Sequence, residues 1–243
     1  MKTIAFVSDI HFDEQFPIDQ GVNAQQNWDK ILESLHSKGV KEVVFGGDIG
    51  AASSHELFFD SLKHFSTHII LGNHDEFAEV SKHYNPCNQS SEIYYEMGDD
   101  HFKYLFMDSS SEKISQEQLN WLKTAVETNK SVLLFVHHPV LPVKTKIDEM
   151  YPLGNRSEVE AILIAAETDI TIFCGHYHMN DEQQKGTIKQ VITHAGSYQI
   201  LKEAPEIAVS NSTFGYRIIN LVEGKIVYRS CDTLIHRKSI NTY

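Results

Sequence analysis

Short hydrophobic runs alternate with segments of helical periodicity along the first three quarters of the chain, which is the pattern typical of α/β folds. Runs of consecutive apolar residues bounded by polar ones predict buried strands. An antiparallel hairpin is expected where residues 93–97 and 102–107 are separated by Gly98-Asp99-Asp100. The buried strands are expected at residues 3–7, 40–45, 68–71, 132–136 and 170–174.

Four helices are predicted from amphipathic spacing and from capping motifs. Residues 25–38 place Trp28, Ile31, Leu32 and Leu35 on one side and end at Gly39. Three further helices are expected to begin at capping boxes, in which a Ser caps the helix and a Glu or Gln follows three residues later. These boxes are Ser53-x-x-Glu56, Ser115-x-x-Gln118 and Ser157-x-x-Glu160, the last opening a helix that runs to residue 166.

The final quarter of the chain changes character and predicts short strands without a helix. They are expected at residues 188–193, 216–222 and 226–228, the last two joined at Glu223-Gly224. The whole pattern predicts two packed mixed β-sheets with helices on the outside. A single domain over residues 1–243 is expected, since α/β chains of up to about 250 residues fold as one unit.

Composition narrows the possible partners. The chain has 21 Lys and Arg against 33 Asp and Glu, a net charge of −12, which argues against a basic surface for nucleic-acid polymers or anionic membranes. A small anionic substrate is still compatible, because salt screens distant charges over roughly 8–10 Å. Three cysteines without a CxxC spacing argue against a disulfide framework. Since neither a membrane span nor a secretory signal is evident, we expect a cytoplasmic protein.

Polar residues of metal-binding type follow five of the predicted strands. In α/β sheets, ligands collect beyond the carboxyl ends of the strands. Each motif alone is compatible with an ordinary turn, or with imidazoles that bond to the backbone. Their joint occurrence predicts one site where Asp, Asn and His side chains bind metal. The motifs are Ser8-Asp9-Ile10-His11, Gly46-Gly47-Asp48, Gly72-Asn73-His74-Asp75, His137-His138-Pro139 and Gly175-His176-Tyr177-His178.

In this order, the motifs resemble those of the calcineurin-like metallophosphoesterases, over residues 8–178. The resemblance implies a four-layer αββα sandwich and a site for two divalent transition-metal ions, Mn, Fe, Zn or Co. It implies that the first metal is held by Asp9, His11 and His178. The second would be held by Asn73, His137 and His176, with Asp48 bridging both. His137 is preferred to His138 because it comes first after its strand.

The implied chemistry needs no Ser or Cys nucleophile. Two metals and two aspartates leave a cationic centre, where a shared water would ionise near pH ~7 and attack the phosphorus as hydroxide. His74 is expected to stabilise the transition state or to protonate the leaving oxygen. Asp75 is expected either to orient His74 or to cap the following helix.

The other histidines, among them His236, are expected to be background residues on the surface or on helix faces, with His138 supporting the ligands. His194 is the one candidate among them for contact with substrate, because it lies in the segment after Gly-His-x-His.

The substrate is expected to be a small phosphodiester. Gly-Asn-His-Asp and Met107-Asp108-Ser109 resemble the cyclic-nucleotide phosphodiesterase branch, which also includes broad-specificity enzymes. The branch often has an acidic or Asn residue shortly after Gly-Asp, whereas Asp48 is followed by Ile49-Gly50-Ala51-Ala52, which favours a promiscuous site. Alternatives are a phosphomonoesterase with the same metals and a non-catalytic scaffold. A nuclease is disfavoured because no basic stripe is present. The oligomeric state is left open.

Overall fold

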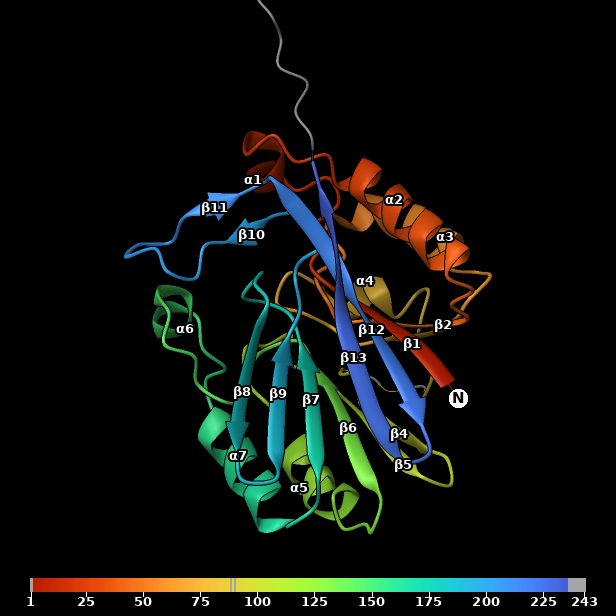
Figure 1. Cartoon of the computed structure of the whole chain (residues 1–243), viewed down its shortest axis with the longest axis vertical. Helices are drawn as coiled ribbons and strands as arrows, with labels where there is room; N and C mark the ends of the chain where they lie inside the picture. The colour runs from red at the N-terminus through yellow and green to blue at the C-terminus, as the bar shows by residue number, and fades with distance from the viewer. Residues whose placement is uncertain (1, 88, 90, 236–243) are drawn as a thin grey trace, which may run out of the picture.

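Two mixed β-sheets pack face to face in the computed structural model, which describes residues 2–87, 89 and 91–235 (Figure 1). In the five-stranded sheet β1 is parallel to β2 and antiparallel to β12, and in the six-stranded sheet β5, β6, β7 and β9 are parallel. The first sheet has the order β13 (Lys225–Leu234), β12 (Thr213–Val222), β1 (Lys2–Val7), β2 (Glu42–Phe45) and β3 (Ser66–Ile69). The second has the order β4 (Tyr95–Gly98), β5 (Phe102–Met107), β6 (Ser131–Val136), β7 (Ile170–Cys174), β9 (Ile188–Ile192) and β8 (Asp181–Lys185).

A layer of aromatic rings fills the space between the sheets. The ring of Phe135 on β6 stacks on those of Phe106 at 5.1 Å, Phe173 at 5.8 Å and Phe6 at 5.9 Å, the last from the opposite sheet. Successive residues of a strand point to opposite faces of the sheet. Side chains such as Leu134, which neighbours Phe135 on β6, therefore point to the outer face of the six-stranded sheet. Both faces of the strands are therefore buried, which explains their continuous apolar runs.

Helices cover the outer faces of both sheets. On the five-stranded sheet, Trp28 of α2 (Ala24–Ser37) and Phe58 of α3 (His55–Ser61) pack on Phe45. On the six-stranded sheet lie α5 (Gln116–Ala125) and α7 (Arg156–Ala165), whose apolar residues share a core with its outer face. The order of layers is helix, sheet, sheet, helix, as expected.

Only one of the three expected capping boxes has its serine as the cap. The Ser115 side chain accepts a hydrogen bond from the Gln118 N–H at the start of α5. The boxes at Ser53 and Ser157 are wrong, because α3 is preceded by a 3₁₀ turn (Ala52–Ser54) and α7 begins after Asn155. Tertiary contacts set these starts: the hydroxyl of Ser54 donates to Asp13, and the Asn155 amide bonds to the backbone of Ile114.

The pattern missed several short elements and some strand ends. Strand β3 ends at Ile69 rather than at residue 71, and β13 is longer than residues 226–228. Within the described ranges, no helix is long and apolar enough to cross a membrane. The missed elements are α1 (Gln15–Asp19), α4 (Phe77–Val80), α6 (Lys146–Met150), β8, β10 (Gln199–Ile200) and β11 (Val209–Ser210).

Candidate metal centre

The loops that follow β1, β2 and β3 meet those that follow β6 and β7 at one end of the two sheets. Parallel strands present their carboxyl ends at one edge. The His11 N–H donates to the Asp48 carbonyl at 3.1 Å, and the Gly175 N–H donates to the His137 carbonyl at 3.0 Å. The structure thereby brings together the side chains of all seven expected metal ligands, Asp9, His11, Asp48, Asn73, His137, His176 and His178.

Five of these seven residues have a left-handed backbone. Their φ angles are 60° at Asp9, 55° at His11, 61° at Asp48, 65° at His176 and 47° at His178. Residues with a Cβ rarely adopt this conformation, which costs about 1–3 kcal/mol each and concentrates at functional sites. Because the backbone turns sharply here, the loops after β1 and β7 can each direct two side chains toward one centre.

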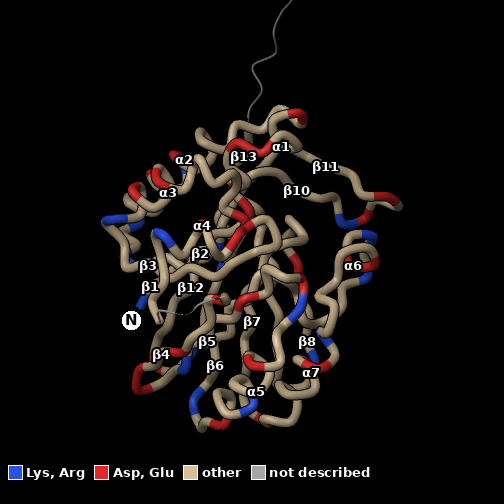
Figure 2. Tube along the Cα trace, turned by 180° about the vertical axis from the view of Figure 1, so that it is seen from behind, with Lys and Arg blue, Asp and Glu red and all other residues tan. Residues whose placement is uncertain are grey.

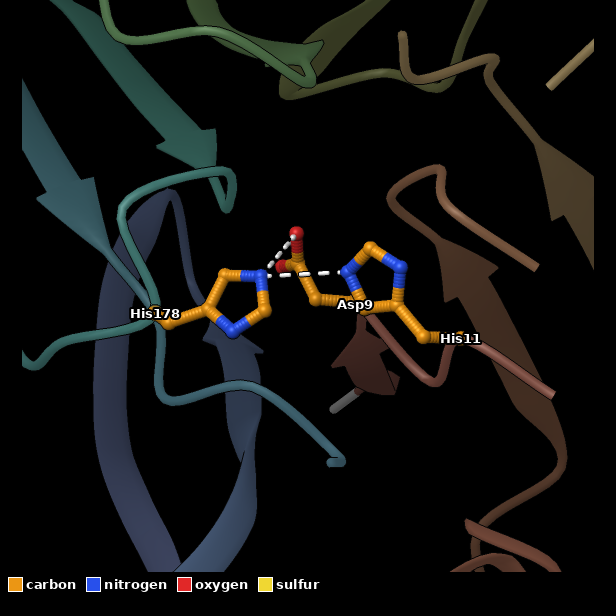
Figure 3. Close-up of side chains that lie close together, drawn as sticks. All are labelled: Asp9, His11 and His178. Carbon is orange, nitrogen blue, oxygen red and sulfur yellow. Dashed lines mark hydrogen bonds and ion pairs between the residues drawn. The ribbon is translucent and has the colours of Figure 1, made fainter. Parts of the chain in front are cut away.

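Asp9, His11 and His178 form the first group of side chains (Figure 3). The Nε2 atoms of the two histidines face each other at 3.2 Å, and His178 Nε2 lies 3.3 Å from Asp9 Oδ1. Figure 3 shows the two rings approaching the carboxylate from opposite sides. Two imidazole nitrogens and a carboxylate oxygen within such distances form a suitable donor set for a transition metal.

Asp9, Asp48 and His137 form a second group that shares Asp9 with the first. His137 Nε2 lies 3.3 Å from Asp48 Oδ2 and 3.9 Å from Asp9 Oδ1. It has no hydrogen-bond partner in the described part of the chain, and neither has Asn73 Oδ1, although both atoms are buried. An unsatisfied buried polar atom costs about 1–3 kcal/mol, so these two atoms fit ligands of a cation.

A backbone carbonyl faces one ring nitrogen in three of the four expected histidine ligands and thereby fixes their tautomers. Because a carbonyl only accepts, this nitrogen carries the proton and the other keeps the lone pair that a metal needs. The pairs are His137 Nδ1 with Gly46 (2.8 Å), His176 Nε2 with Tyr151 (3.0 Å) and His178 Nδ1 with Tyr198 (3.0 Å).

The buried carboxylates of Asp9 and Asp48 favour the presence of positive charge beside them. Burial opposes ionisation of Asp9, but the neighbouring rings of His178 and His137 lower its pKa to about 2. Burial also opposes protonation of His137, yet the charge of Asp48 raises the pKa of His137 to about 10. Either protons or divalent cations meet this demand for positive charge.

His74 lies at the edge of the group with its side chain 46% exposed, and Glu14 holds it there. Glu14 Oε2 lies 3.0 Å from the Nδ1 atoms of both His74 and His11. The bond to Glu14 raises the pKa of His74 to about 9, so His74 is protonated at neutral pH. The sequence-based prediction missed Glu14, whose only signal is an acidic residue three positions after His11.

Asp75 makes different contacts from the two expected. Its oxygens accept hydrogen bonds from the backbone N–H groups of Asp48 at 2.7 Å, Ile49 at 2.9 Å and Gly72 at 2.9 Å. The following helix α4 has Glu76 at its N-cap position and no side-chain cap. The expectation that Asp75 orients His74 or caps that helix is wrong. Asp75 instead ties the loop after β2 to the loop after β3.

The remaining histidines are only partly background. His138 is buried, contacts Ser109 Oγ through Nδ1 at 2.8 Å, and places its ring 4.0 Å from that of His176. His194 Nδ1 lies 2.6 Å from Asp232 and is not among the residues that line the cavity described next. His236 lies outside the described residues.

A cavity of about 410 Å³ opens beside the expected metal ligands. Its polar face includes Asp48, Asn73 and His74. The rest of the lining includes an apolar wall from elements that the sequence did not predict: α1, α6 and the β10–β11 pair with their flanking residues. The wall is formed by Phe16, Ile147, Tyr151, Tyr198, Ile200, Ile207 and Val209.

Residues 2–180 match the family model described as calcineurin-like phosphoesterase. The chain belongs to this family. This calcineurin-like phosphoesterase is 26% identical over 238 residues to a probable cyclic nucleotide phosphodiesterase of Fibrobacter succinogenes, covering 93% of each chain. It is 24% identical to the 3′,5′-cyclic adenosine monophosphate phosphodiesterase CpdA of Haemophilus influenzae, over 83% of this chain and 78% of that one.

The fold is shared with solved structures at much lower identity. A dimetal phosphatase from Danio rerio superposes with a TM-score of 0.67 at 14% identity, covering 94% of this chain and 95% of that one. These comparisons confirm the expected family and αββα sandwich, and with them a metal-dependent phosphoesterase.

Proposed function

We propose that the chain hydrolyses small phosphodiesters at a centre of two divalent metal ions. The observation that carries this proposal is the donor set, in which buried His137 Nε2 and Asn73 Oδ1 have no other partner beside ionised Asp9 and Asp48. One ion is assigned to Asp9, His11 and His178. The other is assigned to Asn73, His137 and His176, with Asp48 shared between both.

The chain's own residues position the substrate and move a proton. When bound, the two ions supply Lewis acidity, which activates water and neutralises charge on the phosphoryl oxygens. Protonated His74, held at Nδ1 by Glu14, donates from its other ring nitrogen to the leaving oxygen. Asp75 accepts hydrogen bonds from the backbone N–H groups of Asp48 and Gly72 and so holds Asp48 in place beside His137.

A diester is preferred to a monoester as substrate on grounds of charge. The cavity is lined by no Lys or Arg among the described residues, so the ions and His74 alone must balance the substrate's negative charge. A diester carries one negative charge and a monoester up to two. The names of the relatives, cyclic nucleotide phosphodiesterases, support the same choice.

A polynucleotide is a poor fit for the surface. Figure 2 shows Lys and Arg scattered among Asp and Glu rather than gathered into a stripe. Since affinity for nucleic-acid backbones depends on clustered positive charge, a small substrate is favoured.

The Asp48→Asn variant tests the metal centre. We expect kcat/KM for bis(4-nitrophenyl) phosphate to fall by at least about 100-fold in Mn²⁺, because the amide removes a charged ligand shared by both ions. Bound metal, measured by mass spectrometry, should fall below two ions per chain. The matched control is Asp60→Asn, at an exposed position on α3, which should change neither quantity. Full activity of Asp48→Asn would contradict the proposed centre.

A substrate panel tests the preference for diesters. With the metal-loaded protein, kcat/KM should be higher for bis(4-nitrophenyl) phosphate than for 4-nitrophenyl phosphate. The opposite order would identify a phosphomonoesterase instead.

A further inference from the structure

The apolar wall of the cavity is built from residues on three separate elements. Phe16 belongs to α1, Tyr151 follows α6, and Tyr198 precedes β10. Figure 1 shows the β10–β11 pair between α1, at the top of the molecule, and α6, which lies below the pair. Aliphatic side chains complete the wall between the aromatic ones.

Backbone hydrogen bonds fasten this wall to the metal-binding histidines. The carbonyl of Tyr151 accepts from His176 Nε2, and the carbonyl of Tyr198 accepts from His178 Nδ1, both at 3.0 Å. The Ile200 N–H in turn donates to the carbonyl of His178 at 2.9 Å. The wall therefore stands at a fixed distance from the ligands that would hold the phosphate.

The aromatic rings differ in how much of each is covered. Tyr198 is 9% exposed, with its ring 4.3 Å from that of His178 and stacked on that of His11 at 5.9 Å. Phe16 meets Tyr198 edge to face at 5.5 Å, yet it stays 51% exposed, as does Tyr151. Large aromatic faces left open beside a polar centre are typical of ligand subsites.

The charges of the residues that line the cavity restrict which groups of a substrate can bind against this wall. Because no described Lys or Arg lines the cavity, a second phosphate or another anionic group on the substrate would have no partner there. The aromatic faces and aliphatic side chains favour a flat, uncharged group. A volume of about 410 Å³ holds a phosphodiester with one ring system.

We propose that Phe16, Tyr151 and Tyr198 form a subsite that binds an uncharged, planar aromatic substituent of the phosphodiester. The subsite rests on the proposed phosphodiesterase function and adds a substrate class to it. Diesters that carry such a ring bind more tightly than those whose substituents are all small alkyl groups.

Two monoanionic phosphonates test the subsite without a leaving-group effect. Methyl phenylphosphonate and methyl methylphosphonate share charge and head group, and differ only in phenyl against methyl on phosphorus. Calorimetric titration of the metal-loaded protein should show about tenfold tighter binding of the phenyl compound. Phe16→Ala and Tyr151→Ala should each reduce this preference by about threefold, because each removes an open ring.

Two neighbouring positions supply matched controls. Ile18 on α1 and Met150 on α6 are each 50% exposed but do not line the cavity, so Ile18→Ala and Met150→Ala should keep the full preference. The Tyr151→Ala change leaves the carbonyl that holds His176 in place, which bound-metal analysis checks. Equal affinity for both phosphonates would overturn the subsite and leave the phosphodiesterase standing. Failure of both to bind, with no turnover of bis(4-nitrophenyl) phosphate, would overturn both proposals.

Discussion

Glu14 connects two histidines that have different proposed tasks. Its Oε2 atom lies 3.0 Å from the Nδ1 atoms of the proposed ligand His11 and the proposed acid His74. Burial opposes its ionisation, but the bonds to the two rings lower the pKa of Glu14 to about 2, so it is a carboxylate at neutral pH. A single charged residue therefore sets the orientation of both rings.

The Glu14→Gln variant should impair leaving-group protonation. We expect kcat for diphenyl phosphate to fall by roughly 10–100-fold, because a neutral amide orients His74 less well and holds its proton less firmly. With bis(4-nitrophenyl) phosphate the loss should be smaller, since 4-nitrophenolate leaves readily without a proton.

The comparison of the two substrates separates positioning of His74 from damage to the metal site. The exposed neighbour Glu76 supplies a control, and Glu76→Gln should behave as the unchanged protein. An equal loss of kcat on both diesters, together with loss of bound metal, would show that Glu14 acts through the proposed ligand His11 and not through His74.

Helix α5 depends on the cap that Ser115 provides. The Ser115 hydroxyl accepts from the Gln118 N–H at 3.2 Å and donates to Glu92 at 2.8 Å. Ser115→Ala should lower the free energy of unfolding by about 1 kcal/mol, measured by urea denaturation. Ser157→Ala should change it by less than about 0.5 kcal/mol, since Ser157 is exposed and lies inside α7. Equal effects of both changes would contradict this assignment of the caps.

Several of the longer elements were predictable from sequence because their side chains obey one constraint along their whole length. Strand β6 is buried on both faces and β7 nearly so, and α2 buries a single stripe that includes Trp28 and Leu35. The five-residue helices α1 and α6 are too short to show a period. Their positions follow from contacts with distant segments, which local sequence does not contain.

The residues of the candidate site also fall into those that local sequence could predict and those that it could not. The seven expected ligands could be proposed from sequence because each lies one to four residues after a strand, so local sequence places it near the shared edge. Glu14 and the apolar wall reach the site through loops and short elements, and no spacing rule connects Tyr151 with Tyr198. The wrong contacts expected for Asp75 have the same cause, because its partner Asp48 is 27 residues away in sequence.

Stability of the whole molecule should respond to pH through an ion-pair network across three strands. Glu42 on β2 lies 2.9 Å from Lys2 on β1 and 3.6 Å from His68 on β3. Burial opposes ionisation of Glu42, but these neighbours lower its pKa below the ordinary value of 4.5. This stabilisation is present in full above about pH 4.5 and is lost as the pH falls through the lower pKa of the folded state.

The Glu42→Gln variant should therefore be less stable than the unchanged protein only at pH values above the range in which Glu42 titrates. We expect up to about 1 kcal/mol at pH 7, and a difference that disappears in acid, measured as thermal unfolding from pH 3 to pH 7. Glu33→Gln, at an exposed position on α2, should show no such dependence. A difference that stays constant with pH would show that Glu42 acts through packing rather than charge.

The order of strands in the five-stranded sheet also constrains how the protein is made. Strand β1 carries Asp9 and His11 beyond its end, and it lies between β2 and β12, with Thr3 opposite Asn220. A growing chain on the ribosome therefore exposes one edge of β1 until some 200 further residues have been added. An unpaired strand edge invites aggregation, so β1 remains dependent on the late hairpin of β12 and β13 for protection. Nascent chains that stop short of β12 would contain every residue of the proposed metal centre, yet they would lack the two strands that complete the five-stranded sheet.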